Sequence, residues 1–150
     1  MTEILFYHLE RQSLDDVLPK LLERSLDRGW KAVVQFSTRE RLDAIDTLLW
    51  TYDDQSFLPH AAEGETDLAD EPVVLTTSIS NPNSAEVRFV VENAAMPTDP
   101  AGYQRVVLMF DGNDEDAVSA ARLSWKALRG SGHELTYWQQ NDSGRWEKKA

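Results

Sequence analysis

Apolar and polar residues follow two different periods along this chain, and the changes of period separate predicted strands from predicted helices. Residues 4–9 carry apolar side chains on both sides of an extended segment, which is typical of a strand buried between two layers. Leucine and valine then follow at helical spacing after Ser13, the predicted N-cap, and Gly29 marks the predicted C-terminal end of this helix. The two sides of the first strand are Ile4, Phe6 and His8, and Leu5, Tyr7 and Leu9.

Similar patterns predict the remaining elements. Ser37 and Glu40 have the spacing of a capping box before a helix that ends near Trp50, and Asp114 is the predicted cap of a helix reaching about Leu128. Residues 51–71 are acidic without a long apolar pattern and are predicted to form a surface loop, and a charged tail follows residue 138. Strands are predicted over residues 32–36, 73–77, 87–91, 106–110 and 135–138, of which 106–110 is the best candidate for a central strand. The order β-α-β-α-β-β-β-α-β predicts an α/β fold with three layers, a sheet with helices on its faces.

The composition fits one domain over residues 1–150. A chain of 150 residues with 41% hydrophobic residues can bury a sizeable core. The absence of cysteine excludes disulfides, a thiolate zinc site and a cysteine nucleophile. No apolar run approaches the ~18–20 residues of a membrane span, and the first residues lack the order of a signal peptide. We therefore expect a soluble, cytoplasmic protein without membrane association.

The charge is strongly negative and unevenly distributed. The chain has 26 acidic and 15 basic residues, a net charge of −11. Residues 122–150 hold six basic and three acidic groups, whereas residues 1–121 hold nine basic and 23 acidic groups. Phosphate backbones repel such a protein overall, so contact with DNA is expected to be indirect. An anionic partner is tolerated best by the last fifth of the chain.

The motifs of nucleotide, metal and hydrolase sites are absent from the sequence. The first two strand-to-helix connections contain no glycine, and Gly130 and Gly132 follow a helix instead of preceding one. The three histidines have no metal-ligand spacing, and the Asp111–Glu115 stretch departs from a calcium-binding loop. We therefore predict no functional nucleotide-binding loop, no catalytic or metal site and no cofactor.

The first candidate interaction site is an apolar cluster in and beside the acidic loop. It consists of Trp50, Phe57 and Pro59. Two interpretations are open at this point. The two aromatic side chains either hold the loop against the core, or form an exposed patch of the kind that binds proteins.

The second candidate is the last predicted helix. Arg122, Lys126 and Arg129 share one face, and Val118 and Trp125 lie along its border. Such a stripe suits an acidic peptide with a bulky apolar end, because arginine forks onto carboxylates and an aromatic group can enter beside the indole. An ordinary solvated face with a half-buried tryptophan is the alternative. The adjoining face, predicted to pack on the sheet, consists of Ala117, Ala120, Ala121, Ser124 and Leu128.

Three segments resemble the chi subunit family of bacterial DNA polymerase III. They are residues 6–9, residues 48–50 with the later Ser-Phe-Leu-Pro-His of residues 56–60, and the Arg122-x-x-Trp125-Lys126 motif. The resemblance runs nearly end to end. It implies a Rossmann-like α/β fold without a working nucleotide site, in an accessory subunit of the clamp-loader assembly. Proteins of this family bind the acidic C-terminal tail of single-stranded DNA-binding protein, and a separate surface binds the psi subunit or, in some bacteria, a helicase.

The resemblance also assigns residues to these two surfaces. Arg122, Trp125 and Lys126 match the tail-binding helix of the family. Val118 replaces a further basic residue expected there, so two outcomes are open: a weaker pocket, or compensation by Arg129. The residues that match the psi- or helicase-binding surface are Trp50, Phe57 and Pro59. Two alternatives remain: an adaptor that acts only through this second surface, and an α/β enzyme with a nonstandard site, which no motif supports.

Overall fold

The computed structural model describes residues 2–10, 12–52, 58–65, 67–97 and 100–150. They form one sheet of eight strands, three α-helices and two short 3-10 helices. In chain order the elements are β1 (Glu3–Leu9), α1 (Leu14–Asp27), β2 (Ala32–Gln35), α2 (Arg39–Thr51), β3 (Ala61–Ala62), η1 (Leu68–Asp70), β4 (Val73–Thr76), β5 (Val87–Val90), η2 (Pro100–Gly102), β6 (Arg105–Asp111), α3 (Glu115–Leu128), β7 (Glu134–Gln140) and β8 (Trp146–Lys148).

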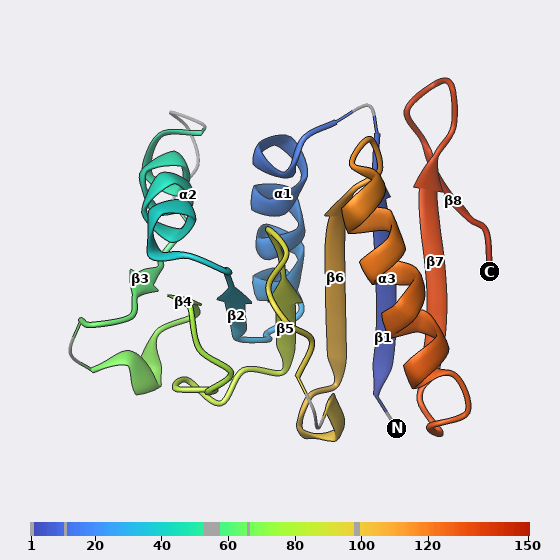
Figure 1. Cartoon of the computed structure of the whole chain (residues 1–150). Helices are drawn as coiled ribbons and strands as arrows, with labels where there is room; N and C mark the ends of the chain where they lie inside the picture. Colours follow the sequence, from blue (N-terminus) through green and yellow to red (C-terminus); the bar gives the residue numbers. More distant parts are fainter. Residues whose placement is uncertain (1, 11, 53–57, 66, 98–99) are drawn as a thin grey trace.

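The sheet has the order β3-β4-β2-β5-β6-β1-β7-β8. Within the part of the chain that the structure describes, the strands pair in parallel except for β8, which runs antiparallel to β7. Helices α1 and α2 lie on one face and α3 crosses the other, so the fold has three layers (Figure 1). This is a Rossmann-like α/β fold, and it confirms the predicted fold class.

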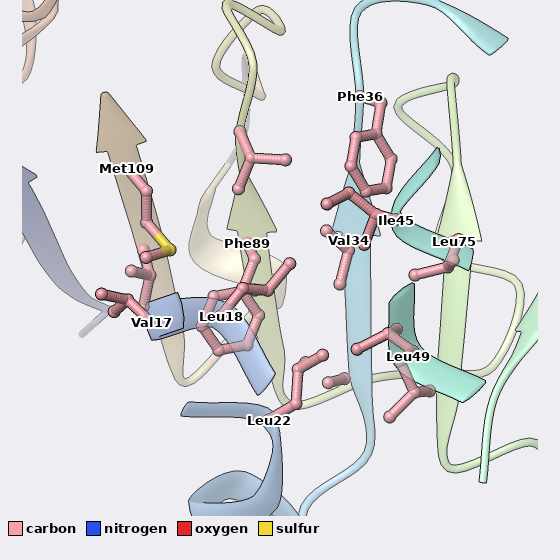
Figure 2. Close-up of a cluster of buried hydrophobic side chains, with 14 of the residues drawn as sticks. Val17, Leu18, Leu22, Val34, Phe36, Ile45, Leu49, Leu75, Phe89 and Met109 are labelled. Carbon is pink, nitrogen blue, oxygen red and sulfur yellow. The ribbon is translucent and has the colours of Figure 1, made fainter. Parts of the chain in front are cut away.

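Two hydrophobic clusters, one on each face, hold the layers together. Figure 2 shows the larger cluster, in which Leu18 and Leu22 of α1 and Leu49 of α2 pack on the strands. On the opposite face, Phe6 and Val106 belong to the cluster beneath α3. The alternation along β1 sends Ile4 and Phe6 to one face and Leu5 and Leu9 to the other, as the sequence predicted. The apolar run in β6 lies between β5 and β1, which confirms it as a central strand.

A buried arginine ties the connection between β4 and β5 to the sheet. Arg88 of β5 is fully buried and donates two hydrogen bonds to Gln35 Oε1, at 3.0 and 2.8 Å. It also donates to the carbonyl oxygens of Ser78 and Ser80 and to the hydroxyl of Tyr103. The five bonds use the donors of the guanidinium without a carboxylate, which makes the burial of this cation tolerable.

Three local predictions are wrong. Thr38, not Ser37, caps α2, because its hydroxyl accepts the Arg41 amide at 3.2 Å. The Ser37 hydroxyl donates to the Glu92 carbonyl oxygen instead. The predicted loop over residues 51–71 contains β3 and η1, and the predicted tail forms β8. These elements of two or three residues are too short to show a period, so pairing with β4 and β7 decides them.

No helix among the described residues is both long enough and apolar enough to cross a membrane.

Candidate protein-interaction sites

Helix α3 begins and ends at clear local signals. The Asp114 side chain accepts hydrogen bonds from the amides of Asp116 and Ala117, at 3.0 and 3.4 Å, as the sequence predicted. Acidic residues occupy the first turn and Lys126 the last, in agreement with the helix dipole. The buried Ala117 and Ala121 bring the helix close to the sheet. Ala120, predicted to pack with them, is exposed, because the small contact face is narrower than the pattern suggested.

Trp125 is the aromatic anchor of this helix. Its ring meets Phe6 edge-on at 5.2 Å between centroids, and Tyr137 of β7 at 6.0 Å. It is partly buried, and Val118 and Leu128 pack against the same cluster. The indole is therefore held in a fixed position and still presents one side to solvent, which is the geometry required of a pocket wall.

The three basic side chains of the stripe are exposed beside this anchor. Arg122, Lys126 and Arg129 are all solvent-accessible, and none joins an ion pair between residues that the structure describes. Their charges are therefore available to an anionic partner. The structure brings Arg122, Trp125, Lys126 and Val118 together along one side of α3, and Arg129 follows directly at the C-cap.

Tyr137 lies beside Trp125, and no sequence pattern pointed to it as a candidate residue. Burial raises the pKa of the Tyr137 hydroxyl, and the negative charge of Glu10 raises it further. The positive charge of Arg122 lowers this pKa, which shows that Arg122 lies within electrostatic reach of Tyr137. The hydroxyl is 2.6 Å from Nδ1 of His8, whose Nε2 lies 2.9 Å from Glu10. The register that places Tyr137 opposite Phe6 requires β7 to adjoin β1, a pairing that no local pattern indicates.

The second candidate site lies at the end of α2. Trp50 is 57% exposed, so a large part of its indole faces solvent. It lies against His60, with 4.5 Å between ring centroids, and the buried His60 ring bonds to Asp46 at 2.9 Å and to the Leu58 carbonyl oxygen at 2.8 Å. Pro59 is half-buried between these anchored neighbours. Phe57 lies outside the described residues.

The carboxyl ends of β1 and β6 form a further concave region, where Rossmann-like folds bind nucleotides. The chain leaves these strands in opposite directions, and a pocket of about 600 Å³ opens there. Its lining includes the five carboxylates of Glu10, Asp15, Glu92, Asp111 and Asp114, and Arg41, which pairs with Glu92 at 2.7 Å. Such an acidic lining is unfavourable for phosphate groups. Within the described ranges, no group of three or more acidic or histidine side chains is arranged to hold a metal.

The fold and these surfaces define a Rossmann-like domain whose accessible features suit binding to other macromolecules. The family model described as DNA polymerase III chi subunit, HolC, matches residues 1–136. A curated relative, "Probable DNA polymerase III subunit chi" from Rickettsia prowazekii (strain Madrid E), is 22% identical over 160 residues, which cover 100% of this chain and 93% of the relative. The chain belongs to the DNA polymerase III chi subunit family.

Membership in this family confirms the resemblance and the assignment to DNA replication. Proteins of this family are accessory subunits of the polymerase, and they act with other replication proteins in the DNA polymerase III complex. The roles of the individual residues of the two surfaces remain predictions.

Proposed function

We propose that this chain is a non-catalytic, cytoplasmic accessory subunit that binds the acidic C-terminal tail of single-stranded DNA-binding protein through α3. Binding of this tail would link the polymerase complex to coated template DNA without direct contact between the chain and DNA. The observation that supports the proposal best is the exposed pair Arg122 and Lys126 on one face of α3, bordered by Trp125, in a chain of net charge −11.

The binding mechanism follows from the residue types. Arg122 presents a planar fork of donors to a carboxylate, and Lys126 one helical turn later attracts further acidic side chains. An apolar end of the peptide packs on the Trp125 and Tyr137 rings, which are already positioned by Phe6. A few contacts of this kind are sufficient for micromolar binding, roughly −8 kcal/mol. Because the cations are exposed, the affinity should fall as salt screens them.

Calorimetric titration with a peptide copying the tail tests this proposal. The Arg122→Ala, Lys126→Ala variant should bind at least ten-fold more weakly, the equivalent of about 1.4 kcal/mol. The matched control is Lys20→Ala, Arg24→Ala, which removes two positive charges at the same spacing from α1, on the other face of the sheet. This control should bind like the wild type. Equal loss in both variants would indicate a general effect of charge and contradict a site on α3.

A second candidate function is favoured by the exposure of Trp50. A large indole that is 57% exposed beside the anchored segment at Pro59 suits an apolar protein surface. We propose this surface as the contact for a psi subunit or a helicase, with Phe57, which lies outside the described residues, as a further predicted member. Titration of the purified psi subunit or helicase should show binding that Trp50→Ala abolishes. Ile79→Ala, which removes a side chain that is 64% exposed elsewhere, should leave binding intact.

A further inference from the structure

A small cavity lies between the second half of α1 and strands β1, β5 and β6. Its volume is about 220 Å³, and Arg24 and Arg28 of α1, Arg105 of β6 and Tyr7 of β1 are among the residues that line it. Three guanidinium groups in one cavity are unexpected in a chain of net charge −11. The cavity is on the face of α1, opposite the face covered by α3.

Two of these three charges have no carboxylate partner among the residues that the structure describes. Arg105 pairs with Glu3 at 2.5 Å. Within the described part of the chain, no ion pair includes Arg24 or Arg28. Both residues are exposed, so their positive charges are accessible to an anion at neutral pH.

A tryptophan fixes the geometry of the site. The Trp30 ring contacts the guanidinium carbon of Arg28 at 5.0 Å from its centroid, and that of Arg105 at 5.2 Å. Contacts of this type stabilise a cation over the face of an indole. They also restrict the freedom of two long side chains before any ligand arrives, which lowers the entropy cost of binding.

The Tyr7 side chain lines the same cavity and lies within electrostatic reach of Arg105 and Arg24. Burial raises the pKa of the Tyr7 hydroxyl, while the charges of Arg105 and Arg24 oppose the rise and Glu3 adds to it. A tyrosine with a raised pKa keeps its proton at neutral pH and can donate a hydrogen bond. The C-terminal end of a helix is partly negative and does not attract an anion. The positive charge at this end of α1 therefore comes from the arginines.

We propose that this cavity binds a phosphate group, held by Arg24, Arg28 and Arg105 and by the Tyr7 hydroxyl. A phosphate monoester carries about −1.5 to −2 charges and three strongly accepting oxygens, which match two accessible charges and a set of forked donors. The volume is below the ~300–1,000 Å³ of sites for larger ligands, so the ligand is inorganic phosphate or the phosphate of a small ester. This site is separate from the surface proposed for the acidic peptide.

Titration with sodium phosphate tests the proposal, at an ionic strength matched with sodium chloride. Binding is followed by the NMR signal of the Trp30 indole, which contacts two of the arginines. The wild type should show a saturable shift. Arg24→Gln, in an exposed position of the helix, should weaken binding at least ten-fold. Lys20→Gln, which removes a charge one turn earlier outside the cavity lining, should bind within two-fold of the wild type.

The outcomes separate this site from the proposed function. A wild type without a saturable shift, or an Arg24→Gln variant that binds as tightly as Lys20→Gln, overturns the phosphate site. Neither result bears on peptide binding at α3, since that is measured separately. Ribose 5-phosphate in place of phosphate distinguishes the source of the anion. Tighter binding identifies an ester as the ligand, and equal binding shows that the phosphate group alone is recognised.

Discussion

The Trp125 ring of α3 meets the Phe6 ring of β1 edge-on, 5.2 Å away and inclined by 70°. This contact joins the proposed peptide site to the centre of the sheet, because Phe6 is fully buried between the layers. Trp125 therefore has two roles, in packing and in recognition, and the two roles can be separated experimentally.

Replacement of Trp125 by alanine should cost stability as well as binding. Loss of a half-buried indole and its two ring contacts is expected to lower the free energy of unfolding by about 1–3 kcal/mol. Urea denaturation measures this change. Leu123→Ala is the control, because Leu123 is 68% exposed on the same helix, and its effect should stay within about 0.5 kcal/mol. Equal stability of the two variants would contradict the anchoring role of Trp125.

Gly112, which follows β6, should not tolerate a side chain. A Cβ there would lie 2.0 Å from the His8 ring and 3.0 Å from the Leu9 carbonyl oxygen. Gly112→Ala is therefore expected to destabilise the fold by about 1–3 kcal/mol and to displace His8. Because His8 contacts the Tyr137 hydroxyl at 2.6 Å, peptide affinity should fall as well.

The matched control for this substitution is Gly102→Ala. Apart from its immediate chain neighbours, no described atom lies within 4 Å of a Cβ at that position. Thermal unfolding compares the stabilities of the two variants. A Gly112→Ala protein as stable as Gly102→Ala would contradict the prediction, because it would show that His8 moves aside without loss of stability.

Glu63 should contribute to stability in a pH-dependent way. Burial raises the pKa of this carboxyl, but hydrogen bonds from Thr77 and Thr76, together with the charge of Arg39, outweigh burial and lower it. A group with a lowered pKa in the folded state stabilises the fold above its unfolded value, about 4.5. That contribution is lost as the pH falls through the folded value. Glu63→Gln should thus be less stable than the wild type at pH 7, and the difference should shrink on acidification. A difference independent of pH would contradict this account.

The sequence predicted the layers of the fold better than the order of the strands within the sheet. Alternation along β1 and the apolar run of β6 are local patterns, and both were placed correctly. The neighbours of a strand depend on how helices cross the sheet, so no local pattern showed that β7 adjoins β1 and brings Tyr137 beside Trp125. The cap of α2 was misassigned by one residue, because Ser37 and Thr38 are both good caps and the bond of Ser37 to Glu92 is a long-range contact.

The candidate residues on α3 were predictable because helical spacing alone groups them. The arginine cavity was not, since its three arginines come from α1 and β6 and lie about 80 positions apart in the chain. The exposure of Trp50 was also undecided in the sequence, where an apolar side chain near an acidic loop is compatible with either a packed or an open position.

The most direct test of the central claim follows the indole NMR signals of the five tryptophans during titration with the tail peptide. Single Trp→Phe variants assign the signals of Trp125 and Trp50. Binding at α3 predicts a saturable shift of the Trp125 signal while the Trp50 signal stays in place, and the shift should weaken with added salt. A shift confined to Trp50, or no shift in the folded protein, would contradict the proposal and favour an adaptor that acts through the α2 surface.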